Sequence, residues 1–142
     1  MDWSARQYVK FEDERTRPAR DLLAGVPTRE PRRVVDLGCG PGNTTELLLS
    51  TFPNAEIIGL DSSPDMITNA RARLRGISFE VADLNTWRPD PAAPVDIIYS
   101  NAVFQWIAGH DAILPRLVGL LPDGVEQATG LVGQFDFIHF FT

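Results

Sequence analysis

The sequence predicts an α/β fold, in which a parallel sheet carries helices on both of its faces. Apolar β-type runs alternate with helical patterns three times, which is typical of parallel strands joined by helical crossovers. A glycine-rich loop follows the first apolar run, and acidic or polar residues follow the later ones. With 142 residues, the chain has the length of one domain.

The chain divides into three segments. The first contains aromatic residues such as Trp3 and Tyr8, and a helical pattern over residues 12–24 that ends before Pro27. The expected segments are an amino-terminal helical segment (1–31), a core that contains the sheet (32–124) and an atypical apolar tail (125–142).

Four strands and three helices are expected in the core. Asn43 or Thr44 is the expected cap of the first helix, Pro64 lies near the start of the second, and Gly76 ends it. The expected strands are residues 33–37, 56–60, 77–81 and 95–99, and the expected helices are residues 43–52, 64–75 and 111–121.

The loop after the first strand is the most informative feature of the chain. Gly38, Gly40 and Gly42 stand at alternate positions between an apolar run and the start of a helix. Glycine lets the backbone turn sharply and approach a ligand without interference from a Cβ atom. The helix that follows points free N–H groups toward whatever lies above the loop.

Acidic and polar residues mark the ends of the other strands. Asp61 follows the second apolar run, at roughly the 20-residue spacing that places a carboxylate on the ribose in nucleoside-binding βαβ units. Asp83 and Ser100-Asn101 also fall at predicted strand ends. Ligands of parallel sheets bind at the carboxyl ends of the strands, so four candidate groups on one rim predict a nucleoside-cofactor site.

The loop departs from the dinucleotide fingerprint G-x-G-x-x-G. Its third glycine arrives one position early, Asn43 stands where that fingerprint needs glycine, and Pro41 removes an N–H donor. NAD(P) is therefore disfavoured, though not excluded. A P-loop is excluded, because no Gly-Lys-Ser/Thr follows the loop.

The run Asp36-Leu37-Gly38-Cys39-Gly40-Pro41-Gly42 resembles motif I of the class I S-adenosylmethionine-dependent methyltransferases. Asp61 matches the acidic residue after their second strand, and Ala82-Asp83-Leu84 matches the segment that meets the adenine ring. The run from Asp96 to Asn101 matches their fourth-strand motif beside the methyl donor. The resemblance implies a Rossmann-like core, truncated relative to the usual seven-stranded fold.

Three further segments resemble one group of that family, the bacterial trans-aconitate 2-methyltransferases. They are the amino-terminal stretch from Trp3 to Leu22, the run from Gly59 to Met66 and the run Asn101-Ala102-Val103-Phe104-Gln105-Trp106. This resemblance implies an O-methyltransferase that acts on a carboxylate of a small acid and gives a monomethyl ester.

The resemblance also assigns residues to S-adenosylmethionine. Asp61 would accept hydrogen bonds from both ribose hydroxyls, Asp83 would accept from the adenine amino group, and Leu84 would flank the ring. Asp36 would lie under the loop and hold its amides or, through water, the ammonium group of the cofactor. The expected cofactor-binding residues are Asp36, Gly38, Gly40, Gly42, Asp61, Ser62, Asp83, Leu84, Asn101 and, from a lid formed by the amino-terminal segment, Trp3, Tyr8 and Arg15.

No acid–base catalytic residue is expected, because a carboxylate acceptor is already ionised at neutral pH. Positioning and water exclusion would carry the reaction. The candidates for binding a polycarboxylate acceptor are Arg17, Gln105, Trp106 and His110. A cofactor-binding remnant without turnover and a methyltransferase with another acceptor remain alternatives.

The bulk composition excludes other classes of protein. The net charge is −6, and residues 34–142 carry five basic and thirteen acidic groups, a net charge of −8, which disfavours binding to nucleic acid or anionic membranes. The single cysteine, Cys39, is expected to be a small buried loop residue, and a cytoplasmic location is expected. No metal site is expected, since His139 has no partner at a ligand spacing.

The tail departs from the family pattern. The resemblance weakens near Gly124, and residues 126–130 are polar where a fifth, apolar strand is expected. The Phe-rich residues 135–141 are expected either to cover the sheet edge as a substitute strand or to promote aggregation. Such a shift in composition is typical of a truncated or frame-altered product, so we expect an intact cofactor half and an incomplete acceptor site.

Overall fold

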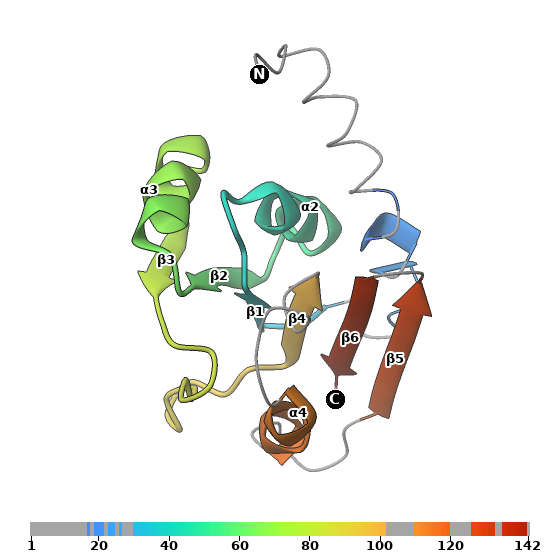
Figure 1. Ribbon diagram of the computed structural model, residues 1–142. Helices are drawn as coiled ribbons and strands as arrows, with labels where there is room; N and C mark the ends of the chain where they lie inside the picture. The colour runs from blue at the N-terminus through green and yellow to red at the C-terminus, as the bar shows by residue number, and fades with distance from the viewer. Residues whose placement is uncertain are drawn as a thin grey trace, which may run out of the picture.

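The computed structural model describes residues 17, 19–21, 23–24, 26, 30–101, 110–119, 126–132 and 135–141. These residues form a six-stranded sheet with the strand order β3-β2-β1-β4-β6-β5, flanked by helices (Figure 1). The predicted fold class, an α/β fold built on parallel strands, is confirmed.

Four strands of the sheet are parallel. They are β1 (Arg33–Leu37), β2 (Glu56–Asp61), β3 (Ser78–Val81) and β4 (Ile97–Asn101). The strand β4 begins two residues later than predicted, and the side chain of Asp96, just before it, binds the main chain at the start of β1. Its Oδ2 accepts hydrogen bonds from the main-chain N–H groups of Arg32 (2.7 Å) and Arg33 (3.1 Å), which ties the start of β4 to the start of β1.

Three helices follow these strands, as predicted. They are α2 (Asn43–Thr51), α3 (Pro64–Arg73) and α4 (His110–Gly119). Ser63 caps α3 by accepting a hydrogen bond from the N–H of Met66, with Pro64 at the first helical position. The predicted caps of α2 are wrong, since Gly42 is the cap residue and no side chain caps the helix. Within the predicted 12–24 helix, the structure describes residues 17, 19–21 and 23–24, and all of them are helical.

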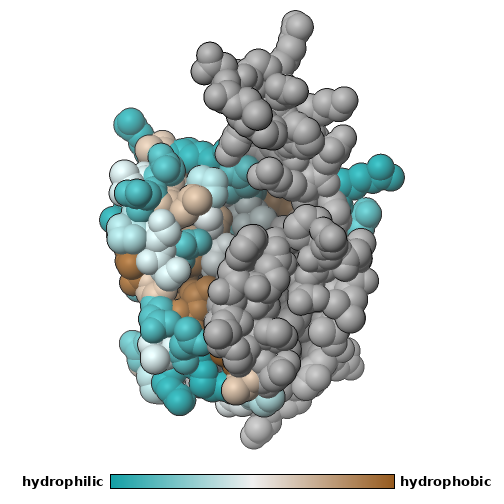
Figure 2. All heavy atoms as spheres, in the orientation of Figure 1, coloured by the Kyte–Doolittle hydropathy of each residue, from teal (hydrophilic) through white to brown (hydrophobic). Residues whose placement is uncertain are grey.

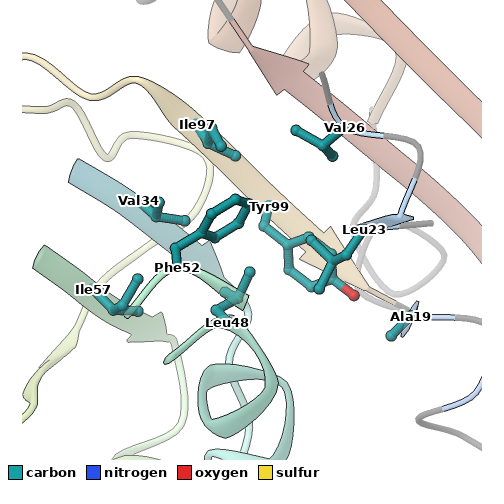
Figure 3. Close-up of a cluster of buried hydrophobic side chains, with 9 residues drawn as sticks. All are labelled: Ala19, Leu23, Val26, Val34, Leu48, Phe52, Ile57, Ile97 and Tyr99. Atoms are coloured by element: carbon teal, nitrogen blue, oxygen red, sulfur yellow. The ribbon is translucent and has the colours of Figure 1, made fainter. Parts of the chain in front are cut away.

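The two faces of the sheet bury separate apolar clusters. Neighbouring residues of a strand point to opposite faces, so Val34 and Val35 belong to different clusters. The first cluster lies under α2 and the amino-terminal helical residues, where Tyr99 extends toward Ala19 and Leu23 (Figure 3). The second lies under α4, whose Ile113 and Leu117 are buried there (Figure 1).

The last two strands form an antiparallel hairpin. The strand β6 (Phe135–Phe141) pairs with β4, and β5 (Glu126–Val132) pairs with β6 at the outer edge. Two residues separate β5 from β6, and a parallel crossover needs a dozen or more, so only antiparallel pairing is open to them. Of the two expectations for the Phe-rich tail, the substitute strand is therefore the one observed.

The strand β5 was not expected from its polar sequence. Backbone pairing with β6 along its whole length supplies the hydrogen bonds of a strand without an apolar side-chain pattern. On the face drawn in Figure 2, hydrophilic residues dominate the surface of the described residues, with small apolar patches between them. Among the described residues, the exposed large apolar side chains are Met66 and Val81.

Gly59 of β2 provides a test of its close packing against Phe79 of β3 and Cys39 of the glycine loop. A Cβ atom at this position would collide with the ring of Phe79 on the neighbouring strand and would lie 3.1 Å from the sulfur of Cys39. We expect Gly59→Ala to lower the free energy of unfolding by about 1–3 kcal/mol, the usual effect of overpacking a core. Urea unfolding measures the change. Gly119→Ala is the matched control, since a Cβ there meets nothing within 4 Å, and an equal loss in both variants would contradict this account.

Candidate cofactor site

The candidate site lies along the carboxyl ends of the four parallel strands. Because these strands run in the same direction, the glycine loop after β1, Asp61 of β2, the turn after β3 and Asn101 of β4 share one edge of the sheet. All three loop glycines have positive φ, with values of 78° for Gly38, 56° for Gly40 and 99° for Gly42. Side chains other than glycine rarely adopt such values, so the backbone geometry requires glycine at each position.

The glycine loop is fixed to the end of β2 by hydrogen bonds. The N–H groups of Gly38 and Cys39 both donate to the carbonyl of Leu60, at 2.7 and 2.9 Å. The N–H of Gly40 donates to Oδ2 of Asp61 at 2.9 Å. The loop therefore holds its shape through contacts with its neighbouring strand.

Asp61 connects three parts of the rim. Its Oδ2 accepts from the loop, its Oδ1 accepts from the N–H of Ser63 at 2.9 Å, and its carbonyl accepts from the N–H of Ala82 at 3.0 Å. The residue is partly exposed. Each carboxylate oxygen has a second lone pair, so both can accept a further hydrogen bond from a ligand.

Asp36 lies beneath the loop and is fully buried. Its Oδ2 accepts hydrogen bonds from the hydroxyls of Thr44 (2.8 Å) and Thr45 (2.6 Å), the latter also buried. The expectation that Asp36 holds the loop amides is wrong, because those amides donate to Leu60, Asp61 and Cys39. Its Oδ1 has no hydrogen-bond partner among the described residues, which leaves it available to a ligand or to water.

Burial changes the protonation of Asp36. Loss of solvent raises its pKa from 3.8 to about 6, the two threonine hydroxyls oppose this change, and the charge of Asp61 adds to it. Burial is also the main reason that the pKa of the Cys39 thiol is raised well above its usual value. Cys39 is therefore the small buried residue that the sequence predicted.

The turn after β3 carries Asp83, which is exposed. Its Oδ1 accepts from the main-chain and side-chain N–H groups of Asn85, at 2.9 and 3.1 Å, and its Oδ2 has no hydrogen-bond partner among the described residues. Leu84 was expected to flank the adenine ring, but its side chain is buried in the core. Only 5% of its surface is exposed, and its side chain packs in the cluster under α4 rather than on the rim, because its apolar surface completes that core.

The remaining predicted site residues are placed only in part. Ser62 is exposed beside Asp61, and Arg17 is exposed on the amino-terminal helical residues. Asn101 ends β4 and His110 begins α4, and the structure describes the backbone of these two residues but not their side chains. The predictions for Trp3, Tyr8, Arg15, Gln105 and Trp106 fall on positions outside the described residues.

Two features of the site were missed in the sequence. Thr44 was expected only as a possible helix cap and Thr45 was not singled out, although a pair of hydroxyls eight and nine positions after the Asp36 carboxylate is a usable signal. Arg116 was not singled out, and it donates to two carbonyls of the turn that carries Asp83. Nothing in the local sequence indicates that contact, which links residues 29 and 32 positions apart.

Among the described residues, no group of three or more His, Cys, Asp or Glu side chains is arranged to hold a metal ion. No helix in the described part of the chain is long and apolar enough to span a bilayer.

The fold and the rim define a protein of the methyltransferase class. A family profile for methyltransferase domains matches residues 34–124, which is more than half of the chain, and the chain belongs to this family. The matched region begins in β1 and extends beyond α4, so it includes the glycine loop, Asp61 and Asp83. The resemblance to methyltransferases that the sequence motifs indicated is confirmed.

Curated relatives of the chain are named trans-aconitate 2-methyltransferase. The protein from Methylobacterium nodulans is 57% identical over 123 residues, which are 87% of this chain and 47% of the relative. That from Rhodopseudomonas palustris strain BisB18 is 54% identical over 135 residues, which are 95% of this chain and 52% of the relative. The chain thus spans about half the length of the curated relatives that it matches. An alignment over 95% of the chain also continues past Gly124, further than the sequence patterns indicated.

Solved structures agree with the fold. A chain in the complex between the Haloferax volcanii Trm112 methyltransferase activator and a methyltransferase is 30% identical, with a TM-score of 0.70, over 89% of this chain and 57% of that one. The amino pentose methyltransferase CalS10 from Micromonospora echinaspora, solved with S-adenosylmethionine bound, is 21% identical with a TM-score of 0.63, over 94% of this chain and 65% of that one. At this identity the second likeness shows the fold alone.

The buried carboxylate of Asp36 predicts a pH dependence of stability. Between pH 4 and pH 6 the native protein retains the Asp36 proton, whereas the unfolded chain, with a pKa of 3.8, has released it. The native state therefore binds more protons, and the free energy of unfolding falls as pH rises through this interval, by roughly 3 kcal/mol for a shift of about two units.

Asp36→Asn removes this ionisation and should flatten the pH dependence by that amount. Urea unfolding at several pH values between 4 and 7.5 measures the slope. The exposed Asp65→Asn is the control and should leave the slope as it is in the wild type. A wild-type slope in the Asp36 variant would show that burial does not hold the proton on this carboxylate.

Proposed function

We propose that the chain binds S-adenosylmethionine at this rim and transfers its methyl group to a carboxylate of a small acid. The observation that carries the proposal is the position of the Asp61 carboxylate, which is held between the glycine loop and the start of α3 with an open lone pair on each oxygen. The expected acceptor is trans-aconitate and the expected product a monomethyl ester, supported by the names of the relatives that share more than half of the aligned residues.

Each part of the cofactor has a matching group on the rim. The positive-φ loop offers bare main chain to the amino-acid tail and the ribose, and Asp61 offers two acceptors to the ribose hydroxyls. The unused Oδ2 of Asp83 would accept from the adenine amino group. Two carboxylates near the loop, Asp36 and Asp61, give the site a negative potential that favours a cationic ligand.

The reaction needs little chemistry from the protein. S-adenosylmethionine supplies an electrophilic methyl group on a sulfonium, and a carboxylate acceptor is ionised at neutral pH. No proton has to be removed, so the absence of a predicted nucleophile–base pair is consistent with the proposal. The protein would contribute the alignment of the two reactants and the exclusion of water, which supply several kcal/mol in well-oriented systems.

The second part of the proposed site is the pocket that would bind the carboxylate acceptor. Arg17, Gln105, Trp106 and His110 remain the candidates for it, and Trp3, Tyr8 and Arg15 remain the candidates for a lid over the cofactor. Two alternatives are kept: a chain that binds the cofactor without turnover, and a methyltransferase for another small acceptor.

Removal of the Asp61 carboxylate tests the cofactor site. We expect Asp61→Ala to lower the affinity for S-adenosylmethionine at least about tenfold, because two charge-assisted acceptors are lost. Asp61→Asn retains the side-chain shape and one acceptor oxygen, and should lose less. Calorimetric titration measures the affinities, with circular dichroism as the check of folding. Asp65→Ala, an exposed carboxylate four residues further on, should bind as the wild type does. Undiminished affinity in both Asp61 variants would place the cofactor elsewhere.

A methyl-transfer assay separates the proposed enzyme from its alternatives. With radiolabelled S-adenosylmethionine we expect label in trans-aconitate and little in monocarboxylic acids, since the candidate acceptor residues Arg17 and His110 would favour a polycarboxylate. Labelling of a different acid would reassign the acceptor. Binding of the cofactor with no label transferred to any acid would leave the chain as a binding module without turnover.

A further inference from the structure

The turn that carries Asp83 lacks the support of regular secondary structure. Residues 82–96, between β3 and β4, form neither a helix nor a strand. The turn closes on itself, since the carbonyl of Asp83 accepts from the N–H groups of Thr86 (3.1 Å) and Trp87 (2.9 Å). These local bonds shape the turn, but they do not fix its position relative to the sheet.

The bond from the N–H of Ala82 to the carbonyl of Asp61 holds the start of the turn, and Arg116 of α4 holds the residues after Asp83. Its Nη1 donates to the carbonyl of Trp87 at 2.7 Å, and its Nη2 donates to the carbonyl of Leu84 at 2.8 Å. The two acceptors lie on either side of Asn85 and Thr86 in the turn, and Arg116 is partly buried. A guanidinium group is planar and presents its donors as a rigid fork, so two such bonds define the orientation of the turn as well as its distance from the helix.

The core completes this arrangement on the other side. Leu84 is buried among the residues under α4, and Trp87 packs against the same cluster. Leu84 is therefore held at its side chain by the core and at its carbonyl by Arg116. Its neighbour Asp83 is left exposed on the rim, with Oδ1 occupied by Asn85 and Oδ2 open.

We propose that Arg116 is a positioning residue that sets the place of the Asp83 carboxylate and thereby the preference of the site for a 6-aminopurine. The inference rests on the proposed function, because it takes Asp83 to be the acceptor for the adenine amino group. A purine with a 6-oxo group presents no amino donor to Asp83. The arrangement therefore makes α4, which is remote in sequence from the glycine loop, a determinant of base specificity.

The test compares two product analogues that differ only in the base. S-adenosylhomocysteine carries the amino group and S-inosylhomocysteine carries an oxo group, and calorimetric titration gives the ratio of their affinities. In the wild type this ratio should favour the adenosyl compound about tenfold or more, the usual effect of one hydrogen bond to a charged group. Asp83→Ala should bring the ratio close to one.

Arg116→Met keeps the apolar stem and removes the fork. We expect it to lower the ratio at least about threefold, mostly through weaker adenosyl binding, and to add little to the loss in the Asp83→Ala background. Arg88→Met removes an exposed arginine of the same segment and should leave the ratio unchanged. Arg116→Lys, which retains the charge without the fork, should behave like the methionine variant and replaces it if that variant does not fold.

The outcomes distinguish the proposed role of Arg116 from the proposed function of the chain. An unchanged ratio in the Arg116 variants, or an equal fall in the affinity for both analogues, would overturn this inference and leave the proposed function in place. Failure of the wild type to bind either analogue would overturn the proposed function, and this inference with it.

Discussion

The carboxylate of Asp61 is the contact on which the geometry of the rim depends. Its two oxygens accept from the glycine loop and from the turn before α3, and its carbonyl accepts from the residue after β3. Three connections of the sheet are thus joined at one residue. A ligand that binds Asp61 therefore contacts a group whose position is already defined, and loses little freedom of the protein on binding.

A second carboxylate supports the first from below. Asp36 is buried at the end of β1, and its hydrogen bonds with Thr44 and Thr45 hold the first turn of α2, which Gly42 leaves without a side-chain cap. The protein tolerates the cost of burying this group, which raises its pKa to about 6. Its Oδ1 stays without a hydrogen-bond partner among the described residues, so this acceptor is left unsatisfied beneath the loop.

The sequence was sufficient for the features that follow from local chemistry. Alternate glycines after an apolar run predicted a sharply turning loop, in which the structure shows positive φ at all three glycines, and the apolar runs predicted β1 to β3 within one residue. Features that depend on distant contacts were missed. Leu84 follows Asp83 directly, yet the core under α4 takes its side chain, and the hydroxyl of Thr44 turns to Asp36 instead of capping its own helix. In each case the position of the side chain is set by a contact with residues more than seven positions away in the sequence.

The hairpin at the end of the described chain shows how far such distant contacts extend. Without β6, the outer edge of β4 would present unpaired N–H and C=O groups, which are costly when they lie at the side of a buried sheet. The strand β6 pairs with this edge along five residues, and the last pair joins Asn101 to Phe137. Asn101 is the residue that β4 contributes to the rim. The strand that carries Asn101 is therefore held by β1 on one side and by β6 on the other, and the hairpin is part of the scaffold that supports the rim.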